Sequence, residues 1–380
     1  MAATTQVGSI KRHFRKLRDP RVVGRSRHLL IDIVFIAICA VIGECDNWQE
    51  IVVFAQMRQA WFKRFLKLPG GVPSHDTFER VFAKLNPQAF ASCCVGWLRD
   101  ISGLLDLKHV AIDGKTLRGS GNSTLGPLHL VSAWAVDANL SLGQVAVDEK
   151  SNEITAIPRL LELLVLKGAL VTIDAIGCQK AIAKKITDKG GDYIFTVKAN
   201  QEQLLHDIQL TVAQGLDGEL PAGTVRQYTT VEHGHGRDEE RSYVVIDHLD
   251  NLRDREAWPK LTMVGMCRSE RTINGKTSTE VRYFIGSPRM SARRYAGALR
   301  NHWRVENNLH WQLDVSMGED QNQVEDRTAA ANLAMIRKFA LSLLKQDPRK
   351  GTLKGKRKAA GLDPDFLAEI LLNAGKIEEL

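Results

Sequence analysis

Apolar residues in the first hundred positions recur at the spacing of helix turns. Three segments show this pattern, and turn signals such as LPGGVP separate them. They are RHLLIDIVFIAICAVIG (27–43), WQEIVVFAQMRQAWFKRFL (48–66) and SHDTFERVFAKL (74–85). Ser74 stands where a helix N-cap belongs, and Asn86-Pro87 follows the third segment. The pattern predicts an all-α N-terminal domain over residues 1–105.

From about residue 107 short apolar runs alternate with amphipathic segments. The predicted strands are HVAIDGKTL (109–117), expected to end at Asp113, HLVSAWAVD (129–137), SLGQVAVDE (141–149), ALVTIDAIG (169–177) and DYIFTVKAN (192–200). The predicted helices are NEITAIPRLLELLVL (152–166), with Asn152 as its cap, CQKAIAKKITDKG (178–190) and QEQLLHDIQLTVAQG (201–215). The order of these elements is therefore βββαβαβα.

A three-stranded meander followed by alternating helices and strands is the topology of the ribonuclease H fold, an α/β architecture. In that fold the first and fourth strands are neighbours in the sheet. We therefore expect Asp113 and Asp174, which follow the apolar parts of those strands, to lie side by side. Residues 106–215 are predicted to form the first part of this core.

The pattern breaks between residues 216 and 287. Short strand-like pieces and turns such as INGK predict a β-rich insertion in the core. Helical spacing returns over residues 288–345, where one continuous helix would place His302, Trp303, Glu306, His310 and Asp314 near one face. A basic C-terminal segment, 346–380, follows. We expect the cationic stretch of this segment to contact a DNA backbone or to form a solvated tail. Its basic residues are Arg349, Lys350, Lys354, Lys356, Arg357 and Lys358, and Lys345 directly precedes the segment.

Composition narrows the class of protein only slightly. The chain has 380 residues, 44% of them hydrophobic and 25% charged, which suits a globular protein with more than one core. Its net charge of +8 favours a polyanionic partner but is equally compatible with plain solubility. The longest apolar run, residues 33–43, is too short to span a bilayer, and the six cysteines form no C-x-x-C pair. We expect a cytoplasmic protein that does not bind membranes.

Two strand-end aspartates and a carboxylate on a returning helix suit metal-assisted phosphodiester cleavage. Hard divalent cations prefer oxygen ligands, and paired cations stabilise both the entering and the leaving oxygen. Asp113, Asp174 and Glu306 would supply such ligands. The stretch between Asp174 and Glu306 is too long for a bare ribonuclease H core, which agrees with the predicted insertion.

Eight ordered blocks of the chain resemble the hallmark blocks of ISAs-type insertion-sequence transposases, which include the H-repeat-associated proteins of Rhs elements. The resemblance covers nearly the whole chain. The blocks are HFRKLRDPR, GVPSHDTFERVF, AIDGKTLRGS, EKSNEITAIPRLL, VTIDAIGCQ, YIFTVKANQ, HGHGRDEERSY and NHWRVENNLHWQLDVSMGED.

The resemblance implies a DDE transposase, an enzyme that hydrolyses DNA at the ends of a mobile element and then joins the freed 3′-hydroxyl to target DNA. The catalytic and metal-binding triad would be Asp113, Asp174 and Glu306, with Mg²⁺ or Mn²⁺ as the cofactor. The expected partners are the double-stranded DNA of the terminal repeats and of the target. We expect a homo-oligomer, because two element ends must be paired, in the cytoplasm of a bacterium and in association with the nucleoid.

One departure from related transposases concerns the pattern Y-x2-R-x3-E-x6-K around the glutamate. The corresponding positions are Leu299, His302, Glu306 and Leu313, so a hairpin intermediate at the element end is in doubt. The phosphate-gripping roles must pass to other residues or be absent. The candidate DNA contacts are Lys115, Arg118, Lys198, Arg237, Arg300, His302, Trp303, Arg304 and His310.

Several alternatives stay open at the level of sequence. Asp314, Glu319 or Asp320 could replace or assist Glu306. His233 and His235 invite a zinc interpretation, but a glycine-rich turn explains two histidines without further spaced ligands better. The segment 74–85 is either a DNA-reading helix or a capped surface helix. A catalytically silent DNA-binding relic and a structure-selective nuclease are the alternative functions.

Overall fold

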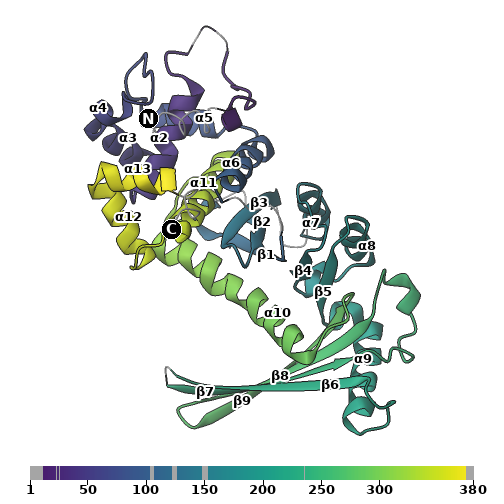
Figure 1. Cartoon of the computed structure of the whole chain (residues 1–380). Helices are drawn as coiled ribbons and strands as arrows, with labels where there is room; N and C mark the ends of the chain where they lie inside the picture. Colours follow the sequence, from purple (N-terminus) through teal and green to yellow (C-terminus); the bar gives the residue numbers. More distant parts are fainter. Residues whose placement is uncertain are drawn as a thin grey trace. The chain divides into compact units, whose positions relative to one another are not determined.

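The protein, seen here in a computed structural model, divides into two compact units, each built from separate stretches of the chain (Figure 1). The structure describes residues 12–22, 24, 26–102, 107–121, 126–147, 153–234 and 236–373. The first unit comprises residues 1–105, 114–152 and 306–380, and the second comprises residues 106–113 and 153–305. The predicted cap Asn152 and the predicted turn residue His235 lie outside the described residues.

The first unit is mainly helical. Its helices are α2 (Leu30–Ile42), α3 (Trp48–Met57), α4 (Gln59–Phe62), α5 (His75–Phe82), α6 (Pro87–Ser102), α11 (Arg327–Gln346), α12 (Leu353–Leu362) and α13 (Pro364–Asn373). Its strands β2 (Leu128–Ala135) and β3 (Leu140–Val147) pair antiparallel. α11 is buried from Ala329 to Leu344 and packs against α2, α6 and β3, so this helix forms the centre of the unit's core.

The second unit contains a mixed sheet with strands in the order β1, β4, β5, β9, β8, β7, β6. The strands are β1 (His109–Leu117, whose last four residues belong to the first unit), β4 (Leu170–Ile173), β5 (Asp192–Val197), β6 (Val225–Gly234), β7 (Arg237–Ile246), β8 (Met263–Ile273) and β9 (Lys276–Gly286). β1, β4 and β5 pair in parallel, and β9 joins β5 antiparallel. The strands predicted for the insertion therefore extend the sheet that carries Asp113 and Asp174.

The helices of the second unit are α7 (Glu153–Glu162), α8 (Lys180–Asp188), α9 (Glu202–Leu216) and α10 (Ala292–Val305). Two long hairpins are formed by β6 with β7 and by β8 with β9. α10 packs over these long hairpins, where Tyr295 and Leu299 join a core with Tyr243 and Phe284. Gly265 on β8 allows this approach, because a Cβ there would lie 2.6 Å from the Tyr295 hydroxyl oxygen. Side-chain packing thus fixes the position of α10 within its unit.

The structure corrects several of the predicted boundaries. β1 does not end at Asp113 but continues to Leu117, and the helix α6 had no counterpart in the predicted pattern. The continuous helix expected after residue 291 ends at Val305 and gives way to π-helical stretches at Glu306–His310 and Gln312–Ser316. A π-helix has hydrogen bonds from residue i to i+5, so the spacing that would place Glu306, His310 and Asp314 on one face does not apply.

The basic C-terminal segment is also different from the predicted tail. It forms α12 and α13, and Arg357 in α12 is buried with 1% of its surface exposed. Its guanidinium donates to the backbone oxygens of Val41 and Ser316 and to the carboxylate of Asp46. Arg357 therefore neither projects into solvent nor is available to a DNA backbone.

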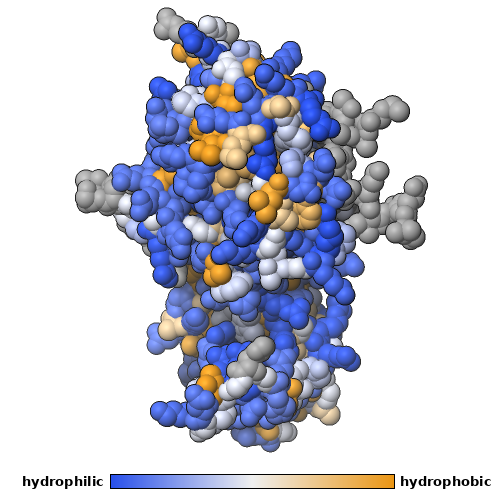
Figure 2. Space-filling model, turned by 90° about the vertical axis from the view of Figure 1, so that its left-hand side faces the viewer, coloured by the Kyte–Doolittle hydropathy of each residue, from blue (hydrophilic) through white to orange (hydrophobic). Residues whose placement is uncertain are grey.

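No helix among the described residues is both long and apolar enough to cross a membrane. Figure 2 shows a face of the molecule on which hydrophilic residues predominate, with hydrophobic residues in small separate groups. Exposed large hydrophobic side chains include Met57 and Leu362.

Candidate active site

Asp113 and Asp174 occupy adjacent strands at equivalent positions. Ile112 on β1 is the register partner of Ile173 on β4, and the two aspartates are the next residues on these parallel strands. Asp174 follows the last residue of β4 and accepts a hydrogen bond from the backbone N–H of Ile176 (3.3 Å). Asp174 is therefore a turn-capping residue and, at the same time, a neighbour of Asp113.

The surroundings of Asp174 disfavour the ionised form of its carboxyl group. Burial raises the pKa of Asp174, and the negative charges of Asp113 and Glu153 raise it further. The N–H of Ile176 and the positive charge of Lys198 offset only part of this effect. The site thus concentrates negative charge that a cation would stabilise.

Glu153 is a member of this acidic group that the sequence analysis missed. It is the first residue of α7 and is buried, with 4% of its surface exposed. An acidic residue at a helix N-terminus interacts favourably with the helix dipole, so its place in the sequence has an ordinary explanation. Its effect on Asp174 follows from the packing of α7 against the turn 175–177, which the sequence pattern does not reveal.

The small and amide residues after Asp174 build a tight turn. Asn200 donates to the backbone oxygen of Ala175 (2.8 Å), and Gln201 donates to that of Cys178 (2.9 Å). These bonds tie the turn after β4 to the turn after β5. A Cβ on Gly177 would lie 2.3 Å from Cγ2 of Ile173, so only glycine fits there without a shift in the backbone or its neighbours.

Two histidines meet on the hydroxyl of Thr172, two residues before Asp174. His109 Nε2 lies 2.9 Å and His302 Nδ1 lies 3.0 Å from Thr172 Oγ1. A hydroxyl can donate to one nitrogen and accept from the other. The contact attaches the C-terminal turn of α10, which carries His302, to β4 beside the aspartate site.

His109 should make the stability of the protein sensitive to acid. Burial, and then the charge of His302, lower the pKa of His109 to about 4. The unfolded chain binds a proton near the usual histidine pKa, so it takes up protons before the folded protein does. The free energy of unfolding should fall by up to about 3 kcal/mol between about pH 6.5 and 4. Unfolding midpoints across this range should vary less in His109→Gln than in wild type, whereas the exposed-site control His233→Gln should follow wild type.

Glu306 begins the π-helical stretch directly after α10 and is exposed. Within the described residues, no group of three or more His, Cys, Asp and Glu side chains is arranged to hold a metal ion. His310 ends the same stretch and is half-buried. The joining of Glu306 to the aspartate pair therefore stays a prediction.

Lys115 lies in a buried ion cluster in the first unit. Its ammonium contacts Asp314 (2.5 Å), Glu319 (2.9 Å) and Asp320 (3.3 Å). Burial alone would raise the pKa of Glu319, but the positive charges of Lys338, Lys115 and Arg337 together lower it. The three acids considered as alternatives to Glu306 thus all have a cationic partner in Lys115.

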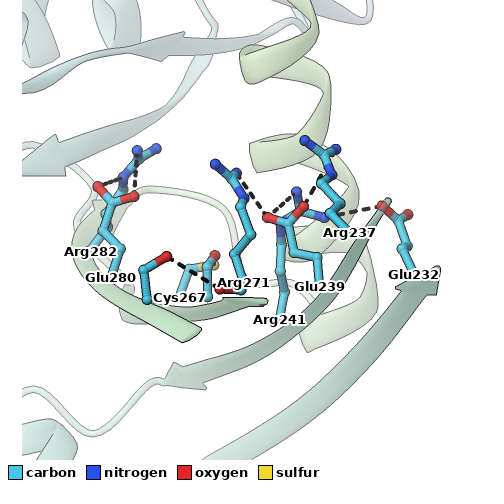
Figure 3. Close-up of polar contacts among 10 residues, drawn as sticks. Glu232, Arg237, Glu239, Arg241, Cys267, Arg271, Glu280 and Arg282 are labelled. Carbon is cyan, nitrogen blue, oxygen red and sulfur yellow. Dashed lines mark hydrogen bonds and ion pairs between the residues drawn. The ribbon is translucent and has the colours of Figure 1, made fainter. Parts of the chain in front are cut away.

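Two of the arginines predicted to bind DNA, Arg237 and Arg300, form ion pairs with glutamates. On the long hairpins, Arg237 pairs with the buried Glu239 (3.5 Å; Figure 3). Arg300 on α10 pairs with Glu232. Glu239 also contacts Arg241 (2.7 Å).

Trp303 on α10 lies beneath two guanidinium groups. The guanidinium carbons of Arg282 and Arg241 are 5.0 and 5.9 Å from its ring centre. These contacts fasten the hairpins to α10.

Arg237 and three further predicted DNA contacts are exposed. Lys198 follows β5 and Arg304 lies in the last turn of α10. Arg118, with 83% of its side chain exposed, lies 3.5 Å from Asp320.

Family models and known sequences match this chain over most of its length. A model described as "Transposase DDE domain" matches residues 105–343, and one described as "DDE_Tnp_1-associated" matches residues 11–98. The chain is 37% identical to the "H repeat-associated putative transposase YhhI" of Escherichia coli K12, covering 97% of this chain and 99% of that one. It is 38% identical to the "Putative transposase YncI" of Escherichia coli O157:H7, covering 98% and 96%. Among solved structures, a piggyBac transposase synaptic complex with hairpin DNA aligns with a TM-score of 0.41 and 8% identity, over 99% of this chain and 79% of that one.

Proposed function

The chain belongs to the transposase DDE domain family, and from this premise we propose that it cuts DNA at the ends of an insertion sequence and joins those ends to target DNA. The observation that carries the proposal is the position of Asp113 and Asp174, which directly follow the register partners Ile112 and Ile173 of two adjacent parallel strands. Burial and neighbouring negative charges raise the pKa of Asp174 there. The raised pKa of Asp174 is a property typical of functional sites, and it supports the choice of these two residues.

We propose that Asp113, Asp174 and Glu306 hold Mg²⁺ or Mn²⁺. Carboxylate oxygens are the ligands these cations prefer, and the accumulated charge at Asp174 fits a divalent cation. The bound cations would activate the attacking oxygen and stabilise the leaving one. Asp113 and Asp174 would hold the cation beside the phosphodiester, and the turn 174–178 keeps Asp174 in place for this role.

Glu306 has indirect support from its neighbours in the chain. The bond between His302 and Thr172 holds the last turn of α10 to β4, and Glu306 follows that turn after Val305. π-Helical turns are frequent at functional sites because they redirect side chains within a helix. We propose that this local change of helix type presents Glu306 to the metal.

Predictions about the fold, the DNA contacts and the oligomeric state follow from the same proposal. The observed order β1, β2, β3, α7, β4, α8, β5, α9 supports a ribonuclease H-like core. Exposed Arg118, Lys198 and Arg304 are the best-placed candidates for phosphate contacts, and His302, Trp303, Arg237 and Arg300 would position the hairpins and α10. Two element ends require at least two copies of the chain, working on the bacterial nucleoid.

The test is strand cleavage and joining on labelled duplex DNA that carries the sequences flanking the gene, with Mn²⁺. Wild-type protein should nick at the element boundary and join the new 3′-hydroxyl to a second duplex. Asp113→Asn and Glu306→Gln should each lower the rate by about 10³-fold or more, because each removes a ligand whose cation supplies several kcal/mol of stabilisation. Both variants should still bind the same duplex.

Three outcomes would contradict the proposal in different ways. Cleavage without joining would indicate a nuclease. Binding without cleavage by folded wild-type protein would indicate a silent relic. Normal cleavage by Glu306→Gln would remove that residue from the triad.

A further inference from the structure

A pocket of about 480 Å³ lies in the first unit, between the chain segment before α2 and helix α5. Five basic side chains line it: Arg21, Arg27 and His28 from the segment, and Arg80 and Lys84 from α5 and the turn after it. None of the described lining residues is acidic. Such a concentration of basic groups around a concave surface favours an anionic ligand.

Two acidic residues close to this pocket in sequence, Asp19 and Asp76, have basic partners. Asp19 binds Arg21 through two contacts, at 2.9 Å to Nε and 2.7 Å to Nη2. Asp76 contacts His75 (3.1 Å), and its backbone oxygen accepts a hydrogen bond from Nε of Arg80 (3.0 Å). Asp19 therefore offsets Arg21, while the backbone contact orients Arg80 without neutralising it.

The pocket has a fixed wall. A Cβ on Gly70 would lie 2.9 Å from the backbone oxygen of Arg27 and 3.0 Å from Cε1 of His28, so the segment rests directly on the turn at Gly70. Nδ1 of His28 is buried and, within the described structure, has no hydrogen-bond partner. A nitrogen without exposed surface cannot contact a ligand in the pocket, so the arginines and the lysine supply the contacts there.

The opposite wall is equally well anchored. α5 packs Phe78 and Phe82 inward, and the Phe82 ring stacks on Trp48 with the ring centres 5.2 Å apart. Ser74 is the residue before the helix, as the sequence predicts, but its hydroxyl contacts that of Thr77 (3.1 Å) and not a backbone N–H.

We infer that this pocket binds one phosphate of a DNA strand together with its adjoining sugar. Arg27, Arg80 and Lys84 supply the positive charge that a phosphate requires. The volume exceeds that of one phosphate, and the apolar side chains of Val22 and Val81 also line it, which suits a sugar. The inference rests on the proposed function for its choice of DNA, and it assigns α5 to backbone contact, where the sequence allowed either base reading or a plain surface helix.

The test compares two double variants with the same loss of charge. Arg27→Gln/Arg80→Gln removes two lining cations, and the control Lys63→Gln/Lys67→Gln removes two exposed cations of the same unit outside the pocket. Affinity for an element-end duplex is measured by fluorescence anisotropy in EDTA at several salt concentrations. The pocket variant should bind about tenfold more weakly and lower the salt slope by about 1, whereas the control keeps the wild-type slope.

Competition with thymidine 5′-monophosphate distinguishes the two sources of the bound phosphate, a DNA strand and a free nucleotide. Weak competition, together with the expected loss in the pocket variant, supports a DNA strand as the ligand. Tight binding of the free nucleotide, with duplex binding unchanged in the pocket variant, would overturn the DNA source. Equal losses in the pocket and control variants would overturn the pocket itself.

This result is separable from the proposed function. Failure of the pocket shows as unchanged binding by Arg27→Gln/Arg80→Gln while metal-dependent cleavage by wild type persists. Failure of the proposed function shows as absent cleavage by wild type in Mn²⁺, whether or not the pocket variant binds more weakly.

Discussion

Asp174→Asn should lose metal-dependent strand cleavage by about 10³-fold or more, while the folded protein stays as stable as wild type or becomes more stable. The two effects have the same origin. Burial and the charges of Asp113 and Glu153 raise the pKa of Asp174 in the folded protein, so its ionised form is disfavoured there. An amide removes that charge and can still accept the hydrogen bond from Ile176.

The direction of the stability change in Asp174→Asn follows from proton linkage. A carboxyl whose pKa is raised by folding binds more protons folded than unfolded, so stability falls as pH rises from the unfolded pKa to the folded one. Above the unfolded-state pKa the raised pKa of Asp174 lowers the stability of the folded protein, and Asp174→Asn should relieve this penalty at neutral pH. Thermal unfolding in EDTA at pH 7 measures this directly, with Asp188→Asn, an exposed residue of α8 in the same unit, as the matched control.

Mn²⁺ adds a second readout that needs no DNA. A cation that binds only the folded protein raises its unfolding midpoint in proportion to the logarithm of its concentration. Wild type and Asp188→Asn should show this rise, and Asp174→Asn should not. An unfolding midpoint well below that of wild type in EDTA would instead make Asp174 a structural turn residue and remove the inference about catalysis.

The aspartate pair could be predicted from sequence because strand order and register follow from local patterns. An apolar run that ends in a carboxylate occurs on two strands, and the elements between them, two further strands and a helix, leave few alternative pairings. Glu153 could not be found in this way. Its sequence position suggests only a helix start, and its effect on Asp174 depends on how α7 packs.

The end of α10 shows a different limit. Periodicity assumes one helix geometry, and the change to a π-helix at Glu306 involves no proline, glycine or gap in the pattern.

Lys115 shows a third limit of prediction from sequence. A lysine beside a candidate metal ligand suggests a phosphate contact, but three acids more than 190 positions away in the chain surround it. Long-range ion pairs of this kind are set by the packed structure and leave no local signal.

Arg357 has the largest predicted effect on stability. A basic C-terminal stretch suggests a solvated tail or a DNA contact, yet Nη2 of Arg357 donates to the oxygen of Val41 (2.9 Å) and to the carboxylate of Asp46 (2.8 Å). Arg357→Met keeps much of the apolar volume but leaves these acceptors and the oxygen of Ser316 without their donor. Removing one partner of a buried charged network costs about 3–5 kcal/mol, so the free energy of unfolding should fall by that amount.

Urea unfolding checks this, with Lys358→Met, the exposed next residue of α12, as a control that should stay within about 0.5 kcal/mol of wild type. In an Asp46→Asn background the cost of Arg357→Met should be smaller, because the carboxylate is no longer there to be left unpaired. Since the network is buried, added salt should not reduce the difference between Arg357→Met and wild type. If Arg357→Met unfolds like wild type and only binds DNA more weakly, Arg357 contacts a DNA phosphate. That result would contradict its role in the buried network.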